Sequence, residues 1–197
     1  MKNLPNRDQS LEIMKKYVKS ETLQRHMLIV EAVMRHFAEL YQEDADAWGI
    51  LGLLHDIDYE LYPDEHCQKA PEILRAEGFD EDFIRSVVSH GYGLVSDIAP
   101  ETNAEKVLFT IDELTGLVYA AALMRPSKSI LDMETKSVMK KFKTPAFAAA
   151  VDREVIRSGA EMLGKSVEEV VTETIVAMRK IASEIGLDGS QAVEENA

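Results

Sequence analysis

The stretch GILGLLHDIDYE, residues 49–60, places a histidine and an aspartate directly after a run of core-forming residues. Its apolar first half, residues 49–54, leads without a break into His55 and Asp56. A buried ionised carboxylate is costly unless a positive group pairs with it. The chain must therefore supply a cation at this point or bind one.

The rest of the chain repeats its apolar residues in steps of three and four, and no alternating stretch lies between hairpin turns. The sequence therefore predicts an all-α fold, a single bundle of about eight or nine helices. Gly78, Gly91 and Gly164 mark helix ends, and Thr144-Pro145 predicts the N-cap and first position of a helix. The predicted helices span residues 9–19, 22–42, 45–56, 64–77, 80–90, 103–124, 134–142, 145–163 and 166–185.

The chain has 197 residues, which is enough for one sizeable core and short for two full domains. We expect an N-terminal helical segment over residues 1–21 and a central core over 22–125. C-terminal helices over 126–186 are expected to pack on this core. The tail over 187–197 is expected to be disordered because it is poor in core residues.

The charge balance is acidic, with 22 Lys and Arg residues against 35 Asp and Glu residues and a net charge of -13. Such a field repels nucleic-acid polymers and anionic membranes, so we expect neither as a partner. The single cysteine, Cys67, cannot form an internal disulfide, and the first ten residues do not resemble a secretion signal. No run approaches the roughly 18 apolar residues of a membrane span. We therefore expect a cytoplasmic protein.

Several histidines lie on the apolar faces of predicted helices. His26 follows Leu23 by three residues and precedes Val30 by four, so it is expected to point inward. His66 and His90 share faces with apolar residues in the same way. His36 lies near a polar boundary of its helix, and the pattern assigns it no role.

Asp112 also lies on an apolar face, in the predicted helix over 103–124. One inward histidine is more often a core residue bonded to a carbonyl than a metal ligand. Four inward histidines and two inward acids on five helices are harder to satisfy separately. One or two divalent cations would neutralise both carboxylates and use the imidazole lone pairs. The positive partner of Asp56 is therefore predicted to be a metal ion.

The order His26, His55-Asp56, His90 and Asp112 resembles that of the HD superfamily of metal-dependent phosphohydrolases, helical proteins named for the adjacent pair. The resemblance extends from the first to the last of these residues. It implies that His26, His55, Asp56 and Asp112 hold one divalent ion from separate helices.

His66 and His90 further resemble the extra pair of two-metal members, in which the aspartate of the His-Asp pair bridges both ions. On this resemblance Asp56 is the bridge. One ion and two ions both stay open, and we favour two because a second ion satisfies two more buried imidazoles. The ligand types suit Fe, Mn, Co, Ni or Zn, and Mg also remains open.

The resemblance implies that a nucleotide or another small phosphorylated metabolite is hydrolysed by metal-activated water. Asp58 could orient this water or move its proton, as could Glu60, although acids at a helix end are more often solvated. The basic stretch over residues 124–143 could grip the phosphate through Lys128, Lys136 and Lys140. A solvated lysine face explains these three residues equally well.

Alternatives remain open. HDIDYE lacks the Gly and Lys of the HDIGK pattern, and HGYG differs from the GYP signature of cyclic-dinucleotide phosphodiesterases, so no subfamily is assigned. Some two-iron relatives with this ligand order are oxygenases, and metal ligands alone do not exclude that chemistry. A further alternative is a non-catalytic helical module in which the metal only stabilises the bundle. The oligomeric state is open, with a homodimer as one candidate.

Overall fold

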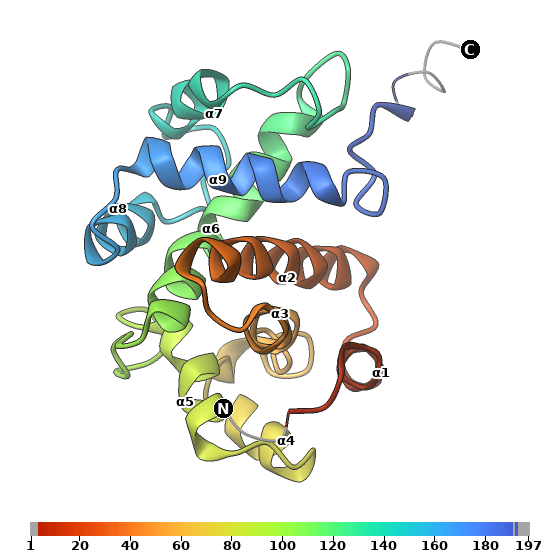
Figure 1. Cartoon of the computed structure of the whole chain (residues 1–197), viewed down its shortest axis with the longest axis vertical. Coiled ribbons are helices and arrows are strands. Elements are labelled where there is room, and N and C mark those ends of the chain that lie inside the picture. The colour runs from red at the N-terminus through yellow and green to blue at the C-terminus, as the bar shows by residue number, and fades with distance from the viewer. Residues whose placement is uncertain (1–3, 191, 193–197) are drawn as a thin grey trace. The chain divides into compact units, whose positions relative to one another are not determined.

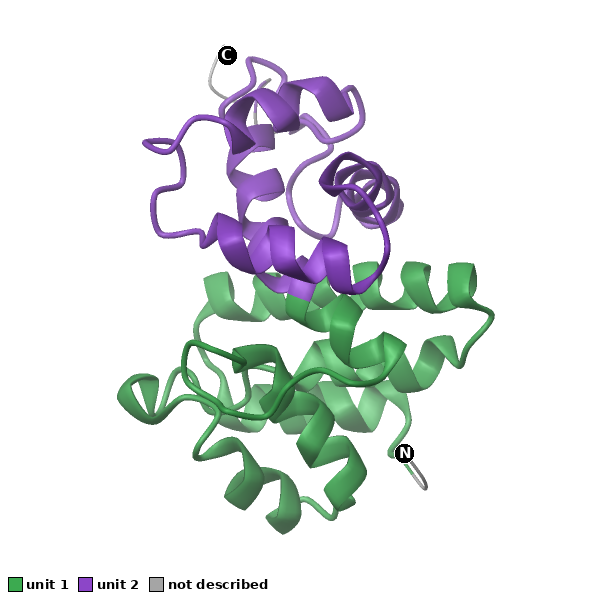
Figure 2. Cartoon of the chain, turned by 90° about the vertical axis from the view of Figure 1, so that its left-hand side faces the viewer, with its two compact units in different colours: residues 1–109 green, residues 110–197 purple. Residues whose placement is uncertain are grey.

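The computed structural model describes residues 4–190 and residue 192 (Figure 1). These residues form nine α-helices and two short 3-10 helices, and their β-structure is limited to two isolated bridges. The predicted all-α fold is confirmed. The chain divides into two compact units, unit 1 over residues 1–109 and unit 2 over residues 110–197 (Figure 2). The predicted segment boundaries at 21, 125 and 186 stay predictions.

Unit 1 begins with three helices, α1 (Arg7–Tyr17), α2 (Glu21–Tyr41) and α3 (Ala45–Leu54). Each starts at a polar residue whose side chain accepts a hydrogen bond from a backbone amide of the first turn, namely Asn6, Ser20 and Asp44. Gln42 ends α2 in the left-handed conformation, with φ of 58°, so the chain turns into α3 within a few residues.

Helices α2 and α3 pack closely against each other. A Cβ atom added at Gly52 would lie 2.9 Å from Cγ of Met34 and 3.0 Å from the carbonyl oxygen of Val30. Only glycine fits between the helices at this point without moving a neighbour. The fully buried side chains of these two helices include Met27, Met34, Phe37, Leu51, Leu53 and Leu54. The packing fixes the C-terminal end of α3 against the middle of α2.

The rest of unit 1 consists of shorter elements: η1 (Pro63–Glu65), α4 (Ala70–Ala76), α5 (Glu81–Val88), η2 (Ser89–Gly91) and the first residues of α6 (Asn103–Leu123). The helix predicted over 64–77 begins only at Ala70. His66 is not helical, with ψ of 141°, and Cys67 has φ of 64°, which is left-handed. Residues 66–69 therefore form turns between η1 and α4.

Unit 2 contains the rest of α6, then α7 (Thr135–Phe142), α8 (Arg153–Met162) and α9 (Val167–Lys180), with α7 and α8 each packing on α9. The helix predicted over 145–163 begins only at Arg153, so the predicted N-cap at Thr144 is wrong. Asp152 is the N-cap, and the Arg153 guanidinium donates to carbonyls of the preceding turns, including those of Phe142 and Val151. These hydrogen bonds satisfy backbone carbonyls of the segment before α8, so this segment does not need to be helical.

The predicted tail begins with residues that the structure describes. Leu187 is buried, its amide donates to the carbonyl of Ala182, and its carbonyl accepts from the amide of Ile130. Residues 191 and 193–197 lie outside the described residues. In the described part of the chain, no helix combines the length and hydropathy required to cross a membrane.

Candidate metal centre

Unit 1 brings together five of the predicted ligands. His26 lies on α2, His55 and Asp56 lie at the C-terminal end of α3, His66 follows η1, and His90 lies in η2. His55, Asp56 and His90 are buried, whereas the side chains of His26 and His66 keep 25% and 12% of their surface exposed. The cluster is thus mostly enclosed, with its two open edges at His26 and His66.

The carboxylate of Asp56 faces a different pair of imidazoles with each of its oxygens. Oδ2 lies 3.6 Å from Nε2 of His26 and 3.4 Å from Nε2 of His55. Oδ1 lies 3.4 Å from Nε2 of His66 and 3.5 Å from Nε2 of His90. A carboxylate placed in this way can serve two cation positions at once, one on each oxygen.

Hydrogen bonds at Nδ1 turn three of these rings toward the carboxylate. In both His55 and His90, Nδ1 donates to the backbone carbonyl three residues earlier, at 2.8 and 2.5 Å. In His66, Nδ1 donates to Oδ1 of Asp58 at 2.8 Å. Because a carbonyl oxygen can only accept, the proton lies on Nδ1, and Nε2 is available as a metal ligand.

These donors fit a divalent metal site. The Nε2 atoms of His66 and His90 are 3.0 Å apart, and those of His26 and His55 are 3.2 Å apart. In the His66–His90 pair both rings already have a hydrogen-bond acceptor at Nδ1, so their Nε2 atoms face each other at a distance that a shared metal ion or a proton can bridge. Ligand atoms of His55, Asp56 and His90 all lie within 4.8 Å of one another. Imidazole and carboxylate donors suit several transition metals, including Fe, Mn, Co, Ni and Zn.

Asp58 is completely buried and supports His66. Its Oδ1 accepts from the His66 ring, and its Oδ2 accepts from the amide of Ala70 at 2.8 Å. Burial lowers the pKa of His66, but the hydrogen bonds to Asp58 and Cys67 and the charge of Asp56 together outweigh it and raise this pKa to about 10. The surroundings of the ring therefore favour positive charge. Both oxygens of Asp58 are engaged, which suits positioning of His66 better than the predicted handling of water.

The side chain of Glu60 accepts hydrogen bonds from the backbone before α2 and is not part of the histidine–aspartate cluster. Its Oε2 accepts from the amides of Lys19 and Ser20, both at 2.8 Å. These amides immediately precede α2, which carries His26. Glu60 therefore ties the segment after the His-Asp pair to the start of the helix that bears another predicted ligand.

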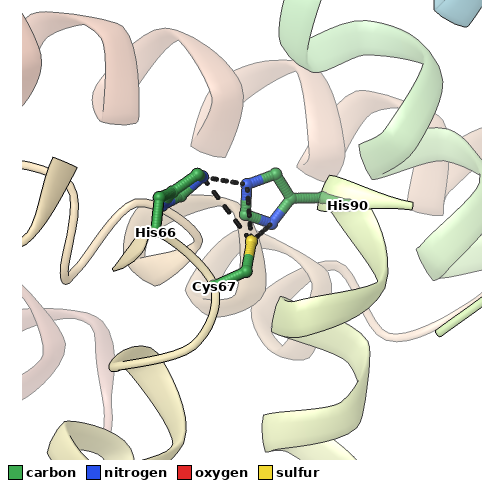
Figure 3. Close-up of side chains that lie close together, drawn as sticks. All are labelled: His66, Cys67 and His90. Carbon is green, nitrogen blue, oxygen red and sulfur yellow. Dashed lines mark hydrogen bonds between the residues drawn. The ribbon is translucent and has the colours of Figure 1, made fainter. Parts of the chain in front are cut away.

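Cys67 is a member of the cluster that sequence reasoning did not identify. Its Sγ lies 3.6 Å from Nε2 of His66 and 3.8 Å from Nε2 of His90. Figure 3 shows the three side chains grouped together. The residue is 1% exposed. Burial raises the pKa of the thiol, but the neighbouring rings of His90 and His66 lower it more, to about 7. Its position directly after a predicted ligand was the available signal.

The remaining predicted site residues belong to unit 2. Asp112 lies on α6 and is half-buried, and its assignment as a ligand stays a prediction. Lys136 and Lys140 lie one turn apart on α7 and are exposed, and Lys136 forms an ion pair with Glu134 at 2.6 Å. Lys128 is half-buried in the segment between α6 and α7. The substrate-binding role of the three lysines stays a prediction.

His36 lies outside the cluster. It follows His26 by ten residues on α2, which corresponds to about 15 Å along a helix. Its ring is buried beside Phe37, and Nδ1 lies 4.0 Å from a carboxylate oxygen of Glu39. It is a core histidine at the edge of the helix face.

Comparisons with known proteins agree with this arrangement. The chain is similar to a tRNA (cytidine(56)-2'-O)-methyltransferase of Picrophilus torridus, with 28% identity over 130 residues. This match covers 59% of the chain and 38% of that protein, so the chain spans well under half of its length. No solved structure matches the chain significantly. Residues 23–117 match the family model described as "HD domain", a stretch that contains all six predicted ligands, and this part of the chain is therefore an HD domain.

Proposed function

We propose that this protein is a metal-dependent phosphohydrolase that cleaves a phosphoester in a nucleotide or another small phosphorylated metabolite. The observation that carries the proposal is the position of Asp56, whose two oxygens face separate pairs of histidines. The HD domain supports the same reaction class.

The residues of unit 1 would hold the metal and fix its surroundings. A divalent ion bound here would polarise a phosphoryl oxygen and lower the pKa of a bound water toward about 7. Asp56 supplies the negative charge that keeps such an ion in place. The hydrogen bonds at Nδ1 of His55, His66 and His90 hold the rings in one orientation, so little reorganisation accompanies binding.

Residues of unit 2 enter the proposal as predictions. The family resemblance adds Asp112 as a further ligand. The lysines of the basic stretch, Lys128, Lys136 and Lys140, are proposed to bind the phosphate of the substrate. The net charge of -13 supports a need for such local cations, because the chain as a whole repels an anionic substrate.

The proposed function is tested by elemental analysis of the purified protein, followed by a screen of phosphate esters and nucleotides with Mn, Co, Fe or Mg added back. We expect bound transition metal and release of inorganic phosphate or of a nucleoside product. The screen is run with and without oxygen. Turnover that requires oxygen would contradict hydrolysis and favour the di-iron oxygenase alternative. Absence of any turnover by the metal-loaded protein, with unfolding on chelation, would favour the non-catalytic module.

A further inference from the structure

The cation position between His66, His90 and Oδ1 of Asp56 also contains a sulfur atom, that of Cys67. Cys67 lies between His66, its neighbour in sequence, and His90, which comes from η2 (Figure 3). Ligand atoms of these three residues all lie within 4.8 Å of one another. They come from two segments of unit 1, so local sequence proximity does not explain the grouping.

The spacing of these donors matches that of a tetrahedral metal site. With metal–nitrogen distances of about 2.0–2.1 Å and a metal–sulfur distance of about 2.3 Å, a tetrahedral ion requires about 3.3 Å between two nitrogens and about 3.6 Å between nitrogen and sulfur. The observed separations are 3.0 Å between the Nε2 atoms of His66 and His90, and 3.6 and 3.8 Å from these atoms to Sγ of Cys67. One ion can therefore contact all three donors with shifts of a few tenths of an ångström.

The packing around Cys67 leaves its sulfur little room elsewhere. A Cβ atom added at Gly91 would lie 2.8 Å from Sγ of Cys67 and 2.6 Å from Cγ2 of Val95. The backbone next to His90 thus approaches the sulfur directly, with no side chain between them. The sulfur is held against the two imidazoles from this side.

We propose that Cys67 is a sulfur ligand of the ion held by His66 and His90, and that it makes this position selective for a thiophilic metal such as Zn²⁺ or Co²⁺ over Mg²⁺. Thiolate donors favour these softer ions, whereas carboxylate and water donors suit Mg²⁺. The inference rests on the metal site of the proposed function but not on its reaction. The competing explanation is a buried cysteine that only fills space beside the rings.

The test is the absorption spectrum of the protein reconstituted with Co²⁺. A thiolate bound to Co²⁺ gives a charge-transfer band in the near ultraviolet, which nitrogen and oxygen ligands do not give. Because Cys67 is the single cysteine of the chain, a band in the wild-type protein assigns the ligand without any variant. Loading is measured in parallel by elemental analysis.

Two variants complete the experiment. Cys67→Ser is expected to lose the band and to bind Zn²⁺ at this position at least about tenfold more weakly, a loss no smaller than that of an outer-shell partner. His36→Gln is the control, because it removes a buried histidine outside the cluster, and it should keep the band. Circular dichroism verifies the fold of both variants.

The outcomes separate the ligand assignment from the proposed function. Wild-type protein that binds Co²⁺ and hydrolyses phosphoesters but shows no charge-transfer band would overturn the role of Cys67 and leave the hydrolase intact. A Cys67→Ser variant with unchanged Zn²⁺ affinity would also overturn it. Wild-type protein that binds no Co²⁺ would overturn the role of Cys67, and the phosphoester screen with Mn, Fe or Mg would still decide the proposed function.

Discussion

The buried carboxylate of Asp58 and the partly exposed ring of His66 form a pair in which Oδ1 accepts the Nδ1 proton at 2.8 Å. The pair places the hydrogen-bond partner of a predicted metal ligand only two residues after Asp56. It also explains why a histidine in an irregular turn can hold a defined ring orientation. Carboxylates of this kind fix the tautomer of the ring and raise its basicity.

Replacing Asp58 with Asn tests this positioning role. The variant keeps the size of the side chain but loses the negative charge behind His66. We expect metal affinity at the His66–His90 position to fall by about 10–100-fold, with a smaller change at the His26–His55 position. Isothermal titration with Zn²⁺ measures both. Equal losses at the two positions would show that Asp58 acts on the fold as a whole.

Replacing Asp56 with Ala tests the proposed bridge. Both cation positions lose an oxygen donor, so we expect loss of metal and of hydrolysis together, while the circular dichroism spectrum stays helical. Elemental analysis and the phosphoester assay measure the two losses. Asp97→Ala removes an exposed acid and serves as the control. Full activity in Asp56→Ala would end the metal-centre account.

Replacing Gly91 with Ala tests the close contact beside Cys67. The new Cβ would lie 2.8 Å from the sulfur, so the side chain of Cys67 or the η2 backbone must move. We expect a loss of about 1–3 kcal/mol in the free energy of unfolding, as for other overpacked sites, together with weaker metal binding at His90. Chemical denaturation of the metal-free and metal-loaded protein separates the two effects. Gly116→Ala is the control, since its Cβ would meet nothing within 4 Å.

Glu105 provides a pH-dependent prediction away from the metal centre. Its carboxylate accepts from Arg85 and Ser86 and from the amides of Glu101 and Thr102. Burial raises the pKa of Glu105, but Arg85 and the other donors lower it more, so the folded carboxyl titrates below its ordinary value. Its stabilisation is therefore complete above the unfolded pKa and is lost as the pH falls through the folded pKa.

We accordingly expect Glu105→Gln to cost about 1–3 kcal/mol in the free energy of unfolding at neutral pH. The difference from the wild type should shrink as the pH is lowered, because the wild-type carboxyl also becomes neutral. Urea denaturation over a pH series measures it. A constant difference at all pH values would mean that the loss comes from packing and not from charge.

The predicted phosphate-binding lysines are tested by Lys136→Ala. We expect a higher KM for the phosphorylated substrate with kcat little changed, because the lysine would bind the ground state and the transition state equally. Lys15→Ala removes an exposed lysine of α1 and is the control for net charge. An unchanged KM in Lys136→Ala would make this residue part of a solvated face.

Much of the fold follows from the periodicity of the sequence, and the failures have local causes. The helices α2, α3 and α6 agree with prediction within two residues at each end, because they are rich in apolar residues and α2 and α3 begin at the capping residues Ser20 and Asp44. The helices that correspond to α4 and α8 were predicted to begin too early, at residues 64 and 145 instead of 70 and 153. In one case the left-handed conformation of Cys67 prevents helix, and in the other the Arg153 guanidinium satisfies the preceding carbonyls. Neither feature produces a repeating pattern of apolar residues in the sequence, so periodicity could not reveal it.

The grouping of His26, His55, Asp56, His66 and His90 in unit 1 was predictable from the sequence, and their role as metal ligands stays a prediction. His26, His66 and His90 share faces with apolar residues, and that pattern was enough to place them inward. The role of Asp58 was not predictable, because the sequence shows an acid at a helix end but not the buried amide of Ala70 that holds it. Cys67 was overlooked because a single cysteine gives no spacing pattern, and only the fold brings it to His90.

The anchoring of Glu60 to the amides of Lys19 and Ser20 bears on how this protein can be shortened. The family match starts at residue 23, so a fragment trimmed to the matched residues would lack both amides. Glu60 would then lose these two hydrogen bonds. The first turn of α2 would then fray toward His26. A minimal working fragment should retain the leader helix α1 and the three residues that join it to α2.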